Sequence, residues 1–334
     1  MSNVLYSITF AVSGLLMAGR EYMVMHGTLV GIVGPTATGK TEVGIKLAKQ
    51  LDGEIISADS MAVYKGMDIG TAKPSPEEQA QVRFHLIDVV YPNEEFSVAE
   101  FKRLAERAIA DIVSRGKIPL LVGGTGLYVK ALVGGLNIPP VAPDYELRER
   151  LRAEALRYGG ECLLDRLRAV DPITAERLHP RDVKRIIRAL EVYALTGIPI
   201  SHHHVTAGKS EVAYHVTLFG LTMSRSELYR RIEDRVDRQV EAGLIQEVRR
   251  LLDQGYSPEL PSMKGLGYKQ IVPYLMSQCD LQTAIEILKR DTRRFAKRQF
   301  TWFRAMPGVH WIDVTERSAK EAASVILNML EAKR

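Results

Sequence analysis

Short runs rich in apolar residues alternate with amphipathic stretches along the first part of the chain. Four such runs predict buried strands, at residues 29–33, 54–57, 85–90 and 118–122. The stretches between them show helical spacing, most clearly after Ser97, which with Glu100 predicts a capping box and a helix that ends at Gly116. Strands that alternate with helices predict an α/β fold, with a mainly parallel sheet and helices on both of its faces.

The pattern changes at residues 134–143, which are rich in glycine and proline. Residues 144–196 then show only helical spacing, and an apolar run at 216–221 predicts a return to the sheet. We therefore expect an all-helical insertion within an α/β core. The expected boundaries are 137–212 for the insertion and 25–136 with 213–334 for the core.

Two long helical patterns follow, at residues 226–255 and 283–304. Thr283 and Glu286 predict a capping box at the start of the second one. This second segment has seven Lys and Arg residues against two Asp and Glu residues, a local excess as large as the net charge of +5 of the whole chain. A basic helix of this kind indicates a polyanionic partner.

A phosphate-binding sequence follows the first predicted strand. Residues 34–41 match the P-loop pattern G-x-x-x-x-G-K-[ST] between a strand and a helix. Inward-pointing N–H groups, the helix N-terminus and the charge of Lys40 favour a diphosphate, and the Thr41 hydroxyl can hold Mg²⁺. The core is therefore expected to be P-loop NTPase-like, although the motif does not identify the molecule that carries the phosphates. The expected phosphate-binding residues are Gly34, Pro35, Thr36, Ala37, Thr38, Gly39, Lys40 and Thr41.

Two further loops should meet the P-loop, because the carboxyl ends of parallel strands lie at one edge of a sheet. Asp59 follows the second strand, where a carboxylate serves Mg²⁺ in a nucleoside triphosphatase, acts as a base in a transferase, or caps a helix. The fourth strand is followed by Gly-Gly-Thr-Gly at 123–126. The mixture of small, apolar and charged residues at 61–74 predicts a loop shaped around a ligand.

The overall composition, with 46% hydrophobic and 25% charged residues among 334, is that of an ordinary globular protein. Cys162 and Cys279 provide no disulfide framework, so reduced thiols in the cytoplasm are the simplest account. Residues 4–19 are mostly apolar, but no Lys or Arg precedes Arg20, as a signal peptide would require. We expect residues 1–24 to be an over-extended start or a disordered arm, and no segment to cross a membrane.

Seven motifs in order, from about residue 28 to residue 312, carry a resemblance to one family. Beyond residues 34–41, 59–74 and 123–128, they comprise 186–192, 231–236 with Gly243 and Leu244, Gly267 with Tyr268, and 296–304. The sequences GMDIGTAKP and KRQFTWFR are the most specific of these. Together they resemble the tRNA dimethylallyltransferase family. Ala62 departs from the larger residue that many members carry.

The resemblance implies transfer of a dimethylallyl group from its diphosphate to N6 of adenosine-37 in the anticodon loop of tRNA. An aromatic amine is a weak nucleophile, so catalysis must stabilise the leaving diphosphate and collect a proton late. By analogy with the family, Lys40 and Arg235 hold the diphosphate with Mg²⁺ near Thr41, and Thr125 donates a hydrogen bond near the transferring group. Asp59 takes the N6 proton as general base. Without the family, the alternative for Arg235 is a helix residue paired with Glu233, Asp234 or Asp237.

The partners implied are tRNA and dimethylallyl diphosphate, with Mg²⁺ as the cofactor, in a cytoplasmic monomer. The target base must leave the stacked loop to reach a buried electrophile, and a single-stranded loop is read by stacking and edge contacts. The expected tRNA-binding residues are Asp59, Ser60, Met61, Ala62, Arg148, Asp182, Lys184, Arg185, Arg188, Lys264, Gly267, Tyr268, Lys269, Arg290, Arg294, Lys297 and Arg298. Of these, residues 264–269 are expected to form a flexible basic loop. Phe295, Phe300, Trp302 and Phe303 are expected to pack in the core.

Two other functions remain open from the residues alone. A phosphotransferase of the nucleotide-kinase type shares the P-loop, the sheet and an inserted lid, but has no need of the basic helix. A non-catalytic RNA-binding protein has no need to retain Lys40, Thr41 and Asp59 together. The three consecutive histidines at 202–204, within the polar and irregular stretch 197–213, lack the spacing and the acidic or cysteine partners of a metal site.

Overall fold

The computed structural model describes residues 28–134, 139, 141–205 and 214–332. Within them, six strands form one sheet in the order β3-β2-β4-β1-β5-β6, and every neighbouring pair is parallel. The strands are β1 (Thr28–Val33), β2 (Gly53–Ser57), β3 (Phe84–His85), β4 (Ile118–Gly123), β5 (His215–Thr222) and β6 (Val309–Asp313). The expected parallel α/β fold is confirmed.

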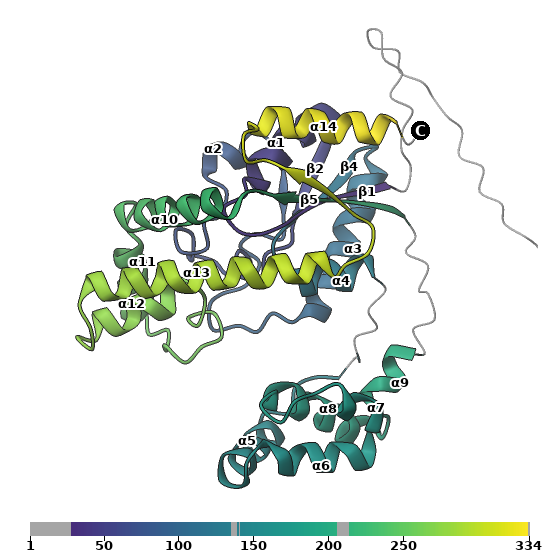
Figure 1. Cartoon of the computed structure of the whole chain (residues 1–334), viewed down its shortest axis with the longest axis vertical. Coiled ribbons are helices and arrows are strands. Elements are labelled where there is room, and N and C mark those ends of the chain that lie inside the picture. Colours follow the sequence, from purple (N-terminus) through teal and green to yellow (C-terminus); the bar gives the residue numbers. More distant parts are fainter. Residues whose placement is uncertain (1–27, 135–138, 140, 206–213, 333–334) are drawn as a thin grey trace, which may run out of the picture.

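Helices cover both faces of this sheet because its strands carry apolar side chains on both sides (Figure 1). Ile55 and Ile56 on β2 point to opposite faces, as successive strand residues do, and belong to two separate cores. The first core contains α1 (Lys40–Leu51) and α14 (Ala319–Glu331). The second contains α3 (Val98–Ser114), α4 (Gly126–Val133) and Phe303.

A third core lies beyond the carboxyl edge of the sheet. It joins Val63 and Met67, in the segment after β2, to residues of four helices. These helices are α10 (Arg225–Glu241), α11 (Leu244–Asp253), α12 (Tyr268–Leu275) and α13 (Leu281–Arg304). The short helix α2 (Pro76–Gln79) follows the same segment. This packing places α10 and α13 beside the loops that follow β1, β2 and β4 (Figure 1).

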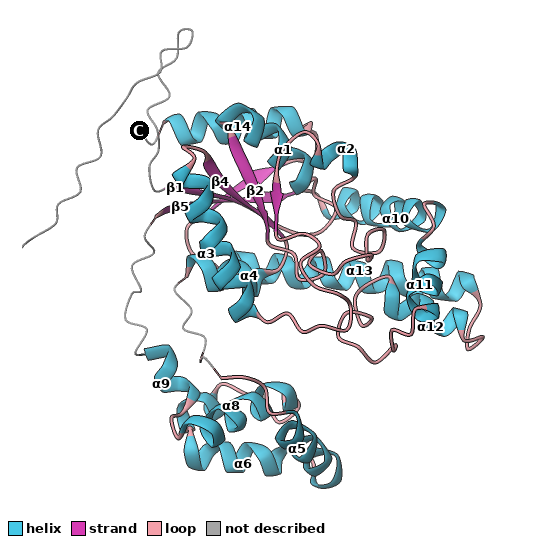
Figure 2. Cartoon of the chain, turned by 180° about the vertical axis from the view of Figure 1, so that it is seen from behind, coloured by secondary structure: helices cyan, strands magenta, loops and turns pink. Residues whose placement is uncertain are grey.

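A helical bundle lies between α4 and β5 in the sequence and contains no strand among its described residues (Figure 2). Its helices are α5 (Tyr145–Tyr158), α6 (Gly160–Val170), α7 (Pro172–Glu176), α8 (Val183–Thr196) and α9 (Ile200–Val205). Leu151, Leu163, Leu167 and Ile186 are fully or almost fully buried in a core of its own. The bundle therefore has the internal packing of a separately folded unit.

Three local expectations are wrong. The strand predicted at 85–90 ends at His85, because Leu86 and Asp88 adopt positive φ angles of 64° and 55°. Thr283 does not form the predicted capping box at the start of α13. Asp280 caps this helix instead, and its side chain accepts the N–H of Thr283 at 2.7 Å. Part of the stretch expected to be irregular forms α9, while residues 206–213 lie outside the described residues.

The helical pattern at 226–255 is divided into α10 and α11 at Gly243, whose φ of 101° favours glycine. Strand β6 and helix α14 were not predicted. Residues 1–24, expected to be an extension or an arm, lie outside the described residues. Among the helices that the structure describes, none has the length and apolar character to cross a membrane.

Candidate active site

The loops after β1, β2 and β4 meet because these strands are neighbours in the sheet. Gly34 has a φ of 137°, and a Cβ there would lie 2.6 Å from the Leu221 carbonyl oxygen, so only glycine fits this turn. Gly39, with a φ of 83°, leads directly into α1. The loop at 34–41 therefore curls ahead of a helix N-terminus, as the P-loop pattern predicted.

Side chains within residues 34–41, called the phosphate loop below, stabilise its curled backbone. Lys40 Nζ donates to the Pro35 carbonyl at 2.6 Å, and Thr38 Oγ1 donates to the same oxygen at 2.8 Å. Thr41 lies half-buried at the start of α1 and lines the adjoining cleft. Lys40 thus lies against its own loop and lines the adjoining cleft.

Two half-buried cations face one carboxylate in this site. Burial and, to a smaller extent, the charge of Arg235 lower the pKa of Lys40 from 10.5 to about 7, against the opposite effect of the Asp59 carboxylate. Burial likewise lowers the pKa of Arg235, against the favourable charge of Asp59. Two desolvated cations with a single nearby carboxylate form a site that lacks negative charge, and an anionic ligand would supply it.

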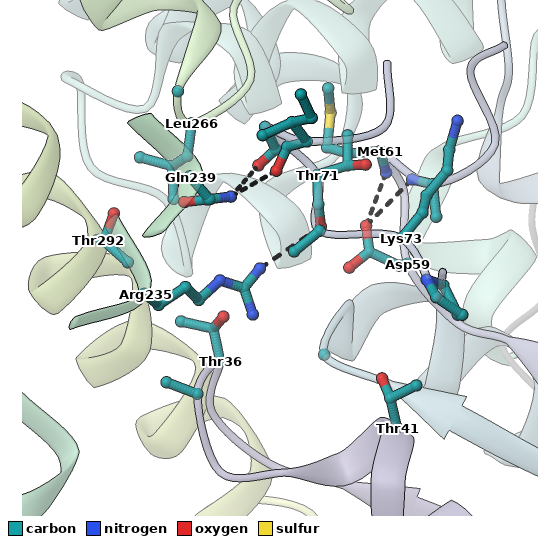
Figure 3. A pocket seen from close by; sticks show the side chains of 18 of the residues that line it. Thr36, Thr41, Asp59, Met61, Thr71, Lys73, Arg235, Gln239, Leu266 and Thr292 are labelled. Carbon is teal, nitrogen blue, oxygen red and sulfur yellow. Dashed lines mark hydrogen bonds between the residues drawn. The ribbon is translucent and has the colours of Figure 1, made fainter. Parts of the chain in front are cut away.

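Arg235 extends from α10 toward Thr36, Thr71 and Asp59 (Figure 3). Its Nη2 donates to the Thr71 carbonyl at 3.5 Å. The acidic neighbours that could have paired with it are held by other cations. Those pairs are Arg293 with Glu233, Arg230 with Asp234, and Lys289 with Asp237. Among the described residues Arg235 has no salt bridge, so its guanidinium is available to the cleft.

Asp59 and Thr125 organise the loops after β2 and β4. Asp59 Oδ1 accepts the N–H of Met61 at 2.8 Å, and the carboxylate lines the cleft. Thr125 Oγ1 accepts the N–H of Ser60 at 3.0 Å and donates to Ser60 Oγ at 3.3 Å. A Cβ on Gly123 would lie 2.2 Å from the Ala58 carbonyl, so the close approach of these loops requires glycine.

The cleft has a volume of about 1780 Å³ and includes residues of all three loops, α10, α13 and the segments at 68–76 and 264–269. It is large enough for more than a single diphosphate ester. Lys73, whose side chain is 3% exposed, holds its wall by bonds to the Tyr64 carbonyl and to the carboxylates of Asp68 and Asp88. In the part of the chain that the structure describes, no three His, Cys, Asp or Glu side chains converge as a metal site.

Three polar residues of this site were missed by the sequence analysis. Gln299 on α13 accepts the N–H of Thr36 at 2.8 Å and donates to the Gly124 carbonyl at 2.9 Å. Gln239 and Glu247 bond the backbone of residues 68–70. All three hold loops of the cleft from helices distant in the sequence.

The residues expected to bind tRNA fall into separate groups. Most of those in the core line the cleft: Asp59, Ser60, Met61, Ala62, Lys264, Gly267, Lys269, Arg294 and Arg298. Arg290 and Lys297 are exposed on α13 outside its lining, Asp182 precedes α8, and Lys184 and Arg185 are exposed on α8. The segment 264–269 is not simply a flexible loop, because Tyr268 begins α12 and is fully buried. Tyr268 therefore offers no surface to RNA in this structure.

Arg148 and Arg188 both bond the carboxylate of Glu191, which is completely buried on α8. The distances are 2.7 and 2.9 Å from Arg148 and 2.6 Å from Arg188. A buried carboxylate that lost either partner would be left poorly compensated. These two arginines hold the helical bundle together, and contact of either with tRNA stays a prediction.

The aromatic residues near the end of α13 do not all lie in the core as expected. Phe303 is fully buried, but Phe295 and Phe300 are half-buried and Trp302 is 37% exposed. Trp302 packs over Gly126, where a Cβ would lie 2.2 Å from the indole ring.

Comparison with known proteins identifies the family. The sequence profile described as IPP transferase matches residues 62–306. The tRNA dimethylallyltransferase of Desulforudis audaxviator (strain MP104C) is 55% identical over 294 residues, which cover 88% of this chain and 94% of that protein. The tRNA dimethylallyltransferase of Acetivibrio thermocellus is 50% identical over 297 residues, covering 89% and 95%.

Solved structures that resemble this chain support the same family. The full-length tRNA isopentenylpyrophosphate transferase of Bacillus halodurans superposes with a TM-score of 0.69 at 45% identity, covering 92% of this chain and 96% of that one. A eukaryotic dimethylallyltransferase acting on tRNA superposes with a TM-score of 0.78 at 29% identity, covering 92% and 80%. With a profile match over most of its length and relatives this similar, the chain belongs to the IPP transferase family.

Proposed function

We propose that this chain transfers a dimethylallyl group from dimethylallyl diphosphate to N6 of adenosine-37 in the anticodon loop of tRNA, releasing diphosphate. Its family membership and the names of its relatives support prenyl transfer to tRNA. The observation that carries the proposal is the cluster of Lys40, Arg235 and Asp59 in one cleft. It combines cationic groups for a leaving diphosphate with a carboxylate for a proton.

The cationic part of the site would act on the leaving group. Breaking an allylic C–O bond leaves an allyl cation and a diphosphate of high charge, so stabilising that charge lowers the barrier. Lys40, Arg235 and the N–H groups at 34–41, apart from that of Thr36, which is bonded to Gln299, would be in place for this before the donor arrives. Because Lys40 and Arg235 are desolvated, their attraction for the diphosphate is stronger than it would be in water.

The proton from N6 would pass to Asp59. N6 becomes acidic only after its bond to the allyl carbon has formed, so the base is needed late. One Asp59 oxygen is held by the N–H of Met61, which fixes the direction of the carboxylate. Thr125, now bonded to Ser60, would turn its hydroxyl toward the reacting groups when the donor is bound.

The residues present fit a divalent cation, which we propose to be Mg²⁺. Mg²⁺ is commonly held by one or two protein oxygens together with substrate phosphates and waters. Thr41, half-buried at the cleft, offers such an oxygen, and the described residues form no all-protein cage. When bound, the ion would neutralise part of the diphosphate charge.

The tRNA would lie against the basic helix α13 and the helical insertion. Adenosine-37 must be turned out of its stack to reach the cleft, whose lining includes Arg294 and Arg298. We propose residues 25–136 and 213–334 as the catalytic core and 137–212 as the part that contacts tRNA. One chain supplies every residue named in this scheme, so a monomer, working in the cytoplasm, suffices.

The proposal is tested by incubating the protein with tRNA, Mg²⁺ and labelled dimethylallyl diphosphate, followed by mass spectrometry of the nucleosides. We expect an adenosine heavier by one dimethylallyl group, located at position 37 by mass spectrometry of ribonuclease fragments, and formed ~10²–10⁴-fold more slowly by the Asp59→Asn variant. A parallel reaction with labelled ATP tests the nucleotide-kinase alternative, which the family does not favour. Transfer of label from ATP to a small acceptor, with unmodified tRNA, would contradict the proposal.

A further inference from the structure

The backbone of residues 68–70, which forms one wall of the cleft, is held from both sides by side chains. The N–H groups of Asp68, Ile69 and Gly70 donate to the Glu247 carboxylate at 2.9, 2.9 and 3.1 Å. The carbonyl oxygens of Ile69 and Gly70 accept from Gln239 Nε2 at 2.6 and 3.0 Å. Two helices, α10 and α11, thus fix both the donors and the acceptors of this segment.

Glu247 is an unusual residue for this place. It is 4% exposed, and among the described residues it forms no salt bridge. Its fourth partner is the hydroxyl of Tyr268, which donates at 2.7 Å. The Tyr268 ring lies so close to Gly70 that a Cβ there would be 2.6 Å from it. Burying a carboxylate costs free energy unless its oxygens accept hydrogen bonds. Four neutral donors, three backbone N–H groups and one hydroxyl, satisfy the Glu247 carboxylate and fix its position.

The segment ends at Thr71, whose carbonyl accepts from the Arg235 guanidinium. Arg235 has no salt bridge among the described residues, and its guanidinium has one hydrogen-bond acceptor there, the Thr71 carbonyl at 3.5 Å. Figure 3 shows the guanidinium between Thr71 and Thr36, with Asp59 on the far side of the same space. A shift of residues 68–71 would therefore move the Arg235 guanidinium relative to the phosphate loop.

We propose that Glu247 is a positioning residue for the diphosphate donor: with Gln239 it fixes residues 68–71 and so directs Arg235 at the phosphate loop. The inference rests on the proposed function for the identity of the ligand. Glu247 itself does not line the cleft, and so acts through Arg235 without touching substrate.

The test uses Glu247→Gln, which keeps the shape of the side chain but places an amide N–H₂ against backbone N–H donors. Calorimetry with inorganic pyrophosphate and Mg²⁺ should show a Kd raised ~10–100-fold, the range expected from loss of a hydrogen bond to a buried charge. The KM for dimethylallyl diphosphate should rise in parallel, while the Kd for tRNA stays unchanged. In a double-mutant cycle, Arg235→Gln should remove most of the effect of Glu247→Gln.

Glu54→Gln is the matched control. Glu54 is also a buried carboxylate, but it bonds Arg115 and His85, near the amino end of β2, and does not line the cleft. This variant should lower Tm and leave pyrophosphate binding unchanged. If Glu247→Gln does not fold, Gln239→Met tests the same segment through its carbonyl oxygens and should also weaken pyrophosphate binding.

Pyrophosphate affinity equal to that of the wild type in the folded variants, or additive effects of Glu247→Gln and Arg235→Gln, would overturn the inference. If the wild type prenylates tRNA while the variants behave normally, this inference alone fails. If the wild type neither binds pyrophosphate nor prenylates tRNA, the proposed function fails with it.

Discussion

Gln299, near the end of α13, accepts the backbone N–H of Thr36 in the phosphate loop at 2.8 Å, although the two residues are 263 positions apart. The same amide donates to the Gly124 carbonyl, and a Cβ on Gly124 would lie 2.3 Å from it. One buried side chain therefore joins the loops after β1 and β4 to the basic helix. The bond also occupies one N–H of the phosphate loop, so that group is directed at protein and not at ligand.

Replacing Gln299 with Ala should loosen the phosphate loop. The Gly124 carbonyl and the part-buried Thr36 N–H would lose their partner, and an unsatisfied buried group costs ~1–3 kcal/mol. We expect a lower Tm and weaker binding of pyrophosphate, measured by thermal unfolding and calorimetry. Gln282→Ala, on the exposed surface of the same helix, is the control and should change neither quantity. Pyrophosphate binding that survives in Gln299→Ala would show that the loop holds its shape alone.

Replacing Asp59 with Asn should separate catalysis from binding. Asn keeps an oxygen for the N–H of Met61 but cannot take a proton, so kcat should fall by ~10²–10⁴-fold. The Kd for tRNA, measured by filter binding, should not change. Asp52→Asn is the surface control, since Asp52 pairs with Lys117 away from the cleft. Retained turnover in Asp59→Asn would reject Asp59 as the base.

Replacing Lys40 with Met should stabilise the ligand-free protein in a pH-dependent way. The pKa of Lys40 is 10.5 in the unfolded chain and about 7 in the folded protein. Between these two pH values the unfolded chain therefore binds more protons than the folded protein does. The free-energy cost of holding a charged Lys40 in the folded protein is therefore complete below pH 7 and disappears as the pH rises toward 10.5. The Tm of Lys40→Met should exceed that of the wild type most at pH 7 or below, and the difference should shrink by pH 9.5. A difference independent of pH would contradict the burial of this charge.

Removing two charges from α13 should weaken tRNA binding and its dependence on salt. Lys297 and Arg298 are exposed and have no salt bridge among the described residues, whereas Arg290 and Arg294 share Asp291. Lys297→Ala with Arg298→Ala should reduce the slope of log K against log salt by roughly 1–2, since each phosphate contact contributes ~0.7–0.9.

Arg103→Ala provides the comparison for that experiment. Arg103 is an equally exposed arginine on α3, paired with Glu100 and outside the cleft. It should leave both the affinity for tRNA and the salt slope unchanged. If the α13 double variant keeps the wild-type slope, this helix is not part of the tRNA interface.

The features that the sequence predicted well are those set by neighbouring residues. Strand, glycine loop and helix follow one another within residues 28–51, so their order and chemistry could be recognised directly. The meeting of the loops after β1, β2 and β4 also followed, because parallel strands present the same ends at one edge. The positive φ angle of Leu86 was not predictable, since leucine rarely adopts that conformation, and that of Asp88 was not, since aspartate, although enriched there, adopts it at only a minority of positions.

The polar residues that hold the cleft were missed because their partners are far away in the sequence. Gln239 and Glu247 bond a segment some 170 residues earlier. A local signal did exist: Glu247 interrupts the buried stripe of α11, and Gln299 that of α13. A polar residue in the apolar face of a helix requires a buried partner, and identifying that partner required the structure.

The helical bundle between α4 and β5 encloses its own apolar cluster around Leu163 and Leu167. Its thermal transition can consequently be separate from that of the sheet, in which case a calorimetric scan of the whole chain would resolve two peaks. A substitution that disturbs this cluster should therefore lower the transition of the bundle and leave that of the sheet, with its cleft, unchanged.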